Sequence, residues 1–386
     1  MSKKIYKLKV EPITCIHIGT GNKLTMLDYK LGKSSSGRHL YAKFSSDRIL
    51  QRISTDAQKS AQFEQASLSD DMKILQNFFQ ENCNINEDSE YFCEITKEFY
   101  ELYSKNRGKD PYDNAAMVEQ MYRSGGANPV IPGSSIKGAI RTAVLNESLS
   151  NISDSSYNSF QDELEQCKSD SKKSRLESKM QKELLGNYRD AKNDPFRAIE
   201  ISDCIFPSKN TQVVGVLKTL SSDKHSGELF ISNSMQIQAE TIKGSLAGNL
   251  DYGTLSFRIN IDLQNEQNAL SQKLGKNDII KSCNYFYWRE FENEYDKFYK
   301  DALDKCDSIL KLRKELEFIK KHDDQFMIRL GHWSQVEFIT FEENLRSPKT
   351  REIRGKKLPY GTTRTVFNND GQYLPLGWCK CTLEEN

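Results

Sequence analysis

The chain has 386 residues, of which 37% are hydrophobic and 28% are charged. Single domains usually contain roughly 100–200 residues, so we expect two domains with packed cores. The 55 basic and 54 acidic residues leave a net charge of +1, which excludes a partner attracted by bulk charge. Any nucleic-acid surface must therefore come from local segregation of charge.

The nine cysteines are scattered without a CxxC pair, which indicates reduced thiols rather than a disulfide framework. The N-terminal segment MSKKIYKLKVEPITCIHIG lacks the apolar core of a signal peptide. No run approaches the roughly 20 apolar residues that cross a bilayer. We therefore expect a cytoplasmic protein that does not contact a membrane.

The apolar pattern changes period several times along the chain. Alternation predicts strands in the N-terminal segment and in YAKF, and apolar stripes through Leu68–Phe79 and Phe92–Leu102 predict two inserted helices. A further helix follows, with Ile136, Ile140, Ala143 and Val144 on its buried face. Residues 151–193 are polar and predict a solvated helix or a partly mobile connector.

The second half of the chain repeats this change of period. Strand-like alternation returns in 194–263, an aromatic-rich helical segment follows in 277–321, and strand-like segments close the chain. This order predicts an α+β fold of two domains, 1–193 and 194–386. Their helical segments are expected at about 60–125 and 264–321.

The segment NPVIPGSSIKGAIRTAVLNES, residues 128–148, carries the clearest chemical signal. Its Gly133-x-x-x-x-Gly138 spacing suggests a phosphate-binding P-loop, but Ala139 and Ile140 stand where that loop needs Lys and Ser or Thr. The sequence therefore argues against an ATPase.

The same segment still suits an anion. Ser134 or Ser135 is expected to cap a helix whose free N–H groups favour negative charge, and Lys137 and Arg141 lie on one helical face. Such like charges repel unless they share a partner, and Gly138 within a helix costs about 1 kcal/mol relative to alanine. A phosphodiester backbone close to this turn would explain both costs. An ordinary helix start with a solvated basic edge stays an alternative.

Four segments in order along the chain resemble the RAMP superfamily of CRISPR-associated proteins. VIPGSSIKGAIRTAVL resembles its glycine-rich loop, and CIHIGTGNKL resembles its first-strand HIGxG motif. NDPFRAIEISDC and the C-terminal strings IRLGHWSQ, TTRTVF and LPLGWCKC resemble segments of the larger type III-A subunits. Within the family, the sequence is most similar to the subunit that caps the guide-RNA 3′ side of the type III-A (Csm) complex.

The resemblance implies two ferredoxin-like (RRM-like) domains and a binding role without catalysis or a cofactor. The implied partners are guide RNA (crRNA), target RNA, the adjacent backbone RAMP subunit, and host nucleases if the 3′ end is trimmed. The glycine-rich loop is expected at 131–141, and its contacts read no base sequence. The implied RNA-binding residues there and in the first motif are Gly133, Ser134, Ser135, Lys137, Gly138, Arg141, His17, Gly19 and Gly21.

Residues 345–366 hold the strongest local excess of positive charge, with Glu352 as the single carboxylate. Such a segment is expected either to follow a phosphate backbone or to act as a solubilising loop. Nearby, Arg329, His332 and Trp333 suit backbone contact or stacking, although a buried tryptophan is the alternative. The candidate RNA-binding residues in this region are Arg329, Arg351, Arg354, Lys356 and Arg364.

Two residues support alternative, enzymatic functions. His17 could act as the general base of a metal-independent ribonuclease, although a histidine at a strand end is more often structural. Asp28 could belong to a target-cleaving RAMP subunit, but its spacing from the glycines departs from that pattern. We expect neither to be catalytic.

Metal binding is not expected. Cys379 and Cys381 share one face of a strand, and with His332 they lack the ligands of a zinc site, so a small apolar core is favoured. The aromatic run Tyr285–Tyr299 has helical spacing and is expected to be core rather than an RNA-stacking surface.

Overall fold

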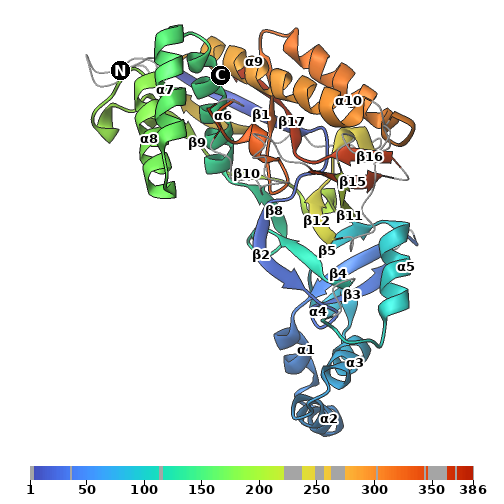
Figure 1. Cartoon of the computed structure of the whole chain (residues 1–386). Helices are drawn as coiled ribbons and strands as arrows, with labels where there is room; N and C mark the ends of the chain where they lie inside the picture. Colours follow the sequence, from blue (N-terminus) through green and yellow to red (C-terminus); the bar gives the residue numbers. More distant parts are fainter. Residues whose placement is uncertain are drawn as a thin grey trace.

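The computed structural model describes residues 4–34, 37–112, 116–220, 237–247, 256–261, 274–300, 303–342, 345–346, 363–369 and 372–385. The chain forms an α+β fold with two large β-sheets and helices packed around them, as the sequence predicts (Figure 1). None of the helices in these ranges combines the length and apolar character that a membrane-spanning segment requires.

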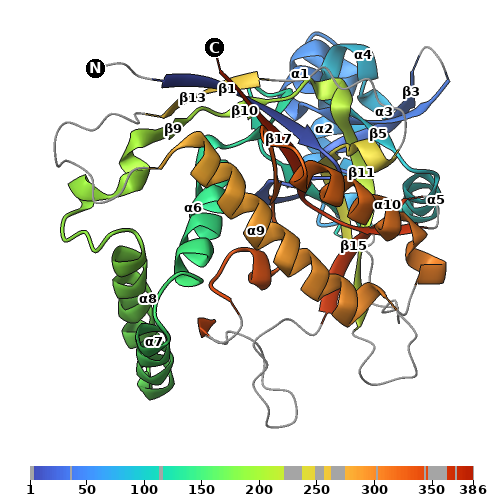
Figure 2. The ribbon, with the colours of Figure 1, turned by 90° about the horizontal axis from the view of Figure 1, so that it is seen from above.

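The first sheet joins the two ends of the chain. Its spatial order is β14 (Gln325–Arg329), β17 (Trp378–Glu385), β1 (Lys4–Pro12), β13 (Ser256–Ile261) and β9 (Ile199–Ile201), and all pairs are antiparallel. Helices α6 (Gly133–Leu149) and α9 (Lys276–Glu294) pack side by side on this part of the molecule (Figure 2). The central strand β1 thus depends on residues from the far end of the chain.

The second sheet also combines strands from both halves. Its order is β2 (Gly19–Leu24), β6 (Val118–Met121), β12 (Ile237–Ile242), β11 (Thr211–Leu220), β5 (Ser89–Ile95), β4 (His39–Phe44) and β3 (Tyr29–Lys33). β15 (Thr363–Asn369) pairs with β11 and with β16 (Gln372–Pro375). A small third sheet contains β10 (Cys204–Ile205), β8 (Asn128–Ile131) and β7 (Arg123–Ser124).

The other helices lie at opposite ends of the molecule (Figure 1). At one end are α1 (Ser46–Ile53), α2 (Ala57–Ser67), α3 (Met72–Asn82) and the short α4 (Ile85–Asp88), with α5 (Lys97–Asn106) beside the second sheet. At the other end α7 (Asp154–Gln166) and α8 (Asp170–Leu184) form the polar segment that the sequence predicts as helical or mobile. A π-helical turn, Tyr295–Tyr299, extends α9 towards α10 (Leu303–Lys320).

One predicted helix is wrong in its first half. Residues 89–95 form β5, because their backbone pairs with β4 and β11, and these pairings outweigh the local helical period. Helix α5 begins only at Lys97, where the Thr96 side chain accepts a hydrogen bond from the Phe99 amide. The insertion expected at about 60–125 therefore contains strands as well as helices.

The division into domains 1–193 and 194–386 stays a prediction. Strands from both sides of residue 193 pair in each large sheet, for example β1 with β13 and β5 with β11. An isolated bridge between Ile16 and Ile242 also connects the segment after β1 to the second sheet.

The main core fills the space between the first sheet and α6, α9 and α10. The four predicted residues of α6 are buried in it, as are most aromatic residues of 285–299. Cys379 and Cys381 are fully buried on β17, and burial raises the pKa of both thiols. In the described ranges, no three His, Cys, Asp or Glu side chains lie close enough to hold a metal ion.

The open edge of β14 is closed by a side chain of α9. Asn284 donates from Nδ2 to the Gln325 carbonyl oxygen (2.9 Å), and its Oδ1 accepts from the Met327 amide (3.1 Å). We expect Asn284→Ala to lower the free energy of unfolding by about 1–3 kcal/mol, because it leaves two backbone groups unpaired. Denaturant unfolding measures the loss, with Asn293→Ala, an exposed asparagine on the same helix, as the control. Equal stabilities of the two variants would contradict the prediction.

Candidate nucleic-acid interface

Four segments that lie far apart in the sequence meet at one hollow of about 450 Å³. The first is the turn into β2 with the start of that strand, the second is β6, the third is the first turn of α6, and the fourth is the loop after β14. The residues that line the hollow are His17, Ile18, Gly19, Thr20, Gly21, Glu119, Ser135, Gly331 and His332. The motifs that the sequence singled out are therefore neighbours in space.

His17 lies at the base of this hollow with only 3% of its surface exposed. Its Nδ1 is 2.7 Å from the Glu240 carbonyl oxygen, and its ring stacks on Trp333 with 4.9 Å between centroids. Burial lowers the pKa of His17, so the ring is neutral near pH 7. These contacts fix the orientation of the imidazole.

The loop after β14 is bound to the first motif through its backbone. The His332 amide donates to the His17 carbonyl oxygen (2.9 Å). Gly331 has φ +96°, and a Cβ there would lie 2.6 Å from the same oxygen. Only glycine fits at this position, because a side chain would be strained at this φ and its Cβ would collide with the His17 carbonyl oxygen.

The segment expected as a glycine-rich loop at 131–141 is mostly helical. Helix α6 begins at Gly133, and its N-cap residue is Pro132, which makes no side-chain cap. The expected cap by Ser134 or Ser135 is wrong, since both residues lie in the first turn. Asp203 supplies the carboxylate instead, and its Oδ1 accepts from the Gly133 amide at 2.8 Å.

The two cations of α6 differ in their surroundings. Arg141 donates to both carboxylate oxygens of Asp194 (2.9 and 3.0 Å) and to the Tyr188 hydroxyl group (3.2 Å). The sequence did not indicate this ion pair, which already gives Arg141 a carboxylate partner within the chain. Lys137 is half-buried, burial lowers its pKa, and no described carboxylate forms an ion pair with it.

Gly133 and Gly138 also differ in their surroundings. A Cβ on Gly133 would lie 2.1 Å from the Ile201 carbonyl oxygen, whereas a Cβ on Gly138 would meet nothing within 4 Å. Ser134 and Gly138 are exposed. At this helix start Ser134 and Gly138 are thus exposed, and Ser135 and Lys137 are half-exposed.

Arg329 and Arg364 are not part of this surface. Both guanidinium groups are buried, and both form ion pairs with Glu294 (2.8 and 3.0 Å). Arg364 also pairs with Glu337 (2.9 Å). In the described conformation both side chains support the fold, and their burial argues against the predicted RNA contact. Arg351, Arg354 and Lys356 lie outside the described residues.

Asp28 closes a turn between β2 and β3. Its Oδ2 accepts hydrogen bonds from the amide of Thr25 (2.8 Å) and from the Thr25 hydroxyl group (3.1 Å). Such a turn gives the carboxylate a structural role. Its lack of a catalytic role stays a prediction.

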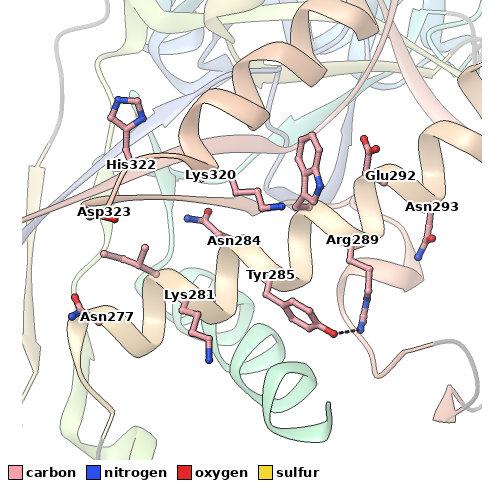
Figure 3. Close-up of a pocket in the computed structure, with 12 residues that line it drawn as sticks. Asn277, Lys281, Asn284, Tyr285, Arg289, Glu292, Asn293, Lys320, His322 and Asp323 are labelled. Carbon is pink, nitrogen blue, oxygen red and sulfur yellow. Dashed lines mark hydrogen bonds between the residues drawn. The ribbon is translucent and has the colours of Figure 1, made fainter. Parts of the chain in front are cut away.

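A second, larger hollow of about 840 Å³ runs along α9 (Figure 3). Lys281, Tyr285 and Arg289 follow one another on its rim, one helical turn apart. Lys281 pairs with Glu147 and Arg289 with Glu342, so protein carboxylates already neutralise two of its cations. The charge of this hollow is therefore largely balanced within the chain.

Sequence reasoning missed the acidic partners of α6. Asp194 and Asp203 lie 53 and 70 residues from the groups that they bind, so no local spacing indicates them. The one available signal was the NDPFRAIEISDC segment, which contains both residues. Thr20 and Glu119 were also missed: Thr20 is the variable position of the HIGxG motif, and Glu119 lies on β6 outside any motif.

Comparisons with known proteins identify one protein family and several similar solved structures. The family model described as the RAMP superfamily matches residues 9–344. A chain of a cryo-EM structure of a Csm–crRNA–target RNA ternary complex from a type III-A CRISPR-Cas system is similar over 100% of both chains, with 17% identity and a TM-score of 0.60. Csm5 of T. onnurineus is similar over 97% of this chain and 99% of its own, with 17% identity and a TM-score of 0.54. No curated protein sequence matches the chain.

Proposed function

The chain belongs to the RAMP superfamily, and from this we propose that it binds guide RNA as the terminal, 3′-side subunit of a type III-A CRISPR complex. The observation that carries the proposal is the convergence of three motif segments on one hollow beside the exposed start of α6. One similar chain comes from a complex that contains crRNA and target RNA, which supports the same reading.

The chemistry of the α6 start suits a phosphate backbone. The helix start offers the amide and hydroxyl groups of Ser134 and the ammonium group of Lys137 as donors to phosphate oxygens. At Gly138 the absence of a side chain lets a phosphate backbone approach the helix closely. These groups contact phosphates and sugars but read no base, as a guide-binding subunit requires because guides differ in sequence. Arg141 acts indirectly, because its ion pair with Asp194 holds the helix against the 194–198 turn.

The proposed role is binding, with guide 3′-end maturation and target capture as its consequences and without catalysis by this chain. The proposed partners are crRNA, target RNA and the adjacent backbone RAMP subunit, with host nucleases needed for trimming. Domains 1–193 and 194–386 and a cytoplasmic location belong to the same proposal. The competing functions are cleavage of guide RNA by His17 and metal-dependent cleavage of target RNA by Asp28. Incubation of the purified chain with guide RNA tests the first, and incubation with target RNA, guide and a divalent metal ion tests the second. Both RNAs are expected to stay intact.

Lys137→Ala tests the proposed interface. We expect weaker binding of a labelled single-stranded guide RNA and a salt dependence, log K against log salt, that flattens by about 0.7, because one phosphate contact is lost. Lys73→Ala is the matched control, since Lys73 is exposed on α3 at the far end of the molecule. The titration is repeated with the adjacent subunit present. An unchanged slope in both formats would exclude α6 as the RNA site.

A further inference from the structure

The lining of the hollow beside His17 is unsuited to a phosphate group. None of its described side chains is a lysine or an arginine, and its one charged group is the carboxylate of Glu119. Lys23 pairs with Glu119 at 3.2 Å, so that charge is partly balanced. The other polar groups are the hydroxyls of Thr20 and Ser135 and two imidazoles. Such a lining suits a neutral, hydroxyl-bearing group such as a ribose.

The protonation of His17 follows from its hydrogen bond. The Glu240 carbonyl oxygen can only accept, so Nδ1, at 2.7 Å, carries the proton. In the neutral ring Nε2 then has a free lone pair, and no hydrogen bond to Nε2 occurs within the described part of the chain. A nearly buried side chain thus presents one unpaired acceptor to the hollow.

We propose that His17 Nε2 accepts a hydrogen bond from one 2′-hydroxyl group of the bound RNA, which makes the hollow selective for ribose over deoxyribose at that nucleotide. The 2′-hydroxyl group is the feature that distinguishes RNA from DNA, and here it meets a pure acceptor. The inference rests on the proposed function, in which Lys137 and the α6 start hold the neighbouring phosphates.

Gly19 keeps this acceptor accessible. A Cβ on Gly19 would lie 2.8 Å from His17 Nε2, nearer than an unbonded carbon and nitrogen approach. The ring cannot move aside easily, because its Nδ1 bond and its stacking on Trp333 fix it. Gly19 is therefore a positioning residue for the same contact, and Gly19→Ala covers Nε2 while retaining the imidazole.

The test is a double-mutant cycle between the protein and the sugar. The probes are a single-stranded guide RNA held in one register by the adjacent subunit, and a set of the same RNA with one 2′-deoxy substitution at each position. For the wild-type chain we expect one position at which the substitution weakens binding by about 3- to 10-fold, the effect of one hydrogen bond. In His17→Asn, whose amide retains the bond to the Glu240 carbonyl, and in Gly19→Ala, that penalty is expected to disappear.

Two controls separate this inference from the proposed function and from misfolding. His322→Ala, which changes a histidine of the separate hollow along α9, is expected to keep the full deoxy penalty. His17→Gln, whose side chain places an oxygen near the Nε2 position, is expected to restore part of it. A penalty that persists in His17→Asn, or RNA binding without a penalty at any position, would overturn the inference and leave the proposed function intact. RNA binding that is unaffected by Lys137→Ala would instead overturn the proposed function.

Discussion

A Glu294→Ala variant is expected to lose about 3–5 kcal/mol of unfolding free energy, because it leaves two buried guanidinium groups without their shared carboxylate. Glu294 lies at the end of α9 and pairs with Arg329 of β14 and Arg364 of β15. The three side chains are at most 2% exposed. This cluster joins a helix and both large sheets, so its loss is expected to weaken the whole C-terminal half.

Glu292→Ala is the matched control two residues earlier on the same helix. Glu292 pairs with Arg313 at 2.7 Å, but the two side chains are 30% and 40% exposed. A pair so exposed contributes at most about 1 kcal/mol. Denaturant unfolding of both variants measures the difference. If Glu294→Ala does not fold, Glu294→Gln replaces it, since glutamine keeps the shape of the side chain but not its charge. This variant is expected to fold and to lose an intermediate amount of unfolding free energy. Equal losses for Glu292→Ala and Glu294→Gln would contradict the argument.

The helix α6 and its buried face were predictable because their signal is local. Ile136, Ile140 and Val144 recur at helical spacing, and the structure buries all three. Residues 89–95 have a similar local pattern, yet two partner strands draw them into the second sheet. Periodicity cannot foresee this result, since the partners lie elsewhere in the sequence.

The sequence indicated the motifs of His17, Ser135 and Gly331, but neither their convergence nor the electrostatics around them. In the structure the three residues line one hollow, while their contact with RNA stays a prediction. A sequence gives the charged residues but not which of them are buried. Arg329 and Arg364 were therefore predicted to bind RNA, although each is buried in an ion pair with Glu294. Similarly, Arg141 looked unpaired because Asp194 is 53 residues away.

The two glycines of the PGSSIKG string are expected to respond in opposite ways to alanine. Gly133→Ala is expected to lower the free energy of unfolding by about 1–3 kcal/mol or more, because the new Cβ would lie 2.1 Å from the Ile201 carbonyl oxygen. That neighbour is backbone and cannot rotate away. Asp203 also binds the Gly133 amide, so a shift of the helix start would break this cap as well. Thermal and denaturant unfolding measure the loss.

Gly138→Ala is expected to stabilise the chain and to weaken RNA binding. The gain in unfolding free energy is about 1 kcal/mol, since alanine is the better helix former and its Cβ meets only open space. In the proposed interface, the added methyl group would displace the phosphate backbone from this turn. The loss of one charge-assisted hydrogen bond to a phosphate would then weaken binding about tenfold or more. Ser148→Ala, near the end of the same helix, controls for helix propensity alone. A folding defect cannot explain weaker RNA binding in a variant that is more stable. Reduced affinity of Gly138→Ala for RNA would therefore indicate a direct RNA contact. Unchanged affinity would mean that no RNA passes close to this turn.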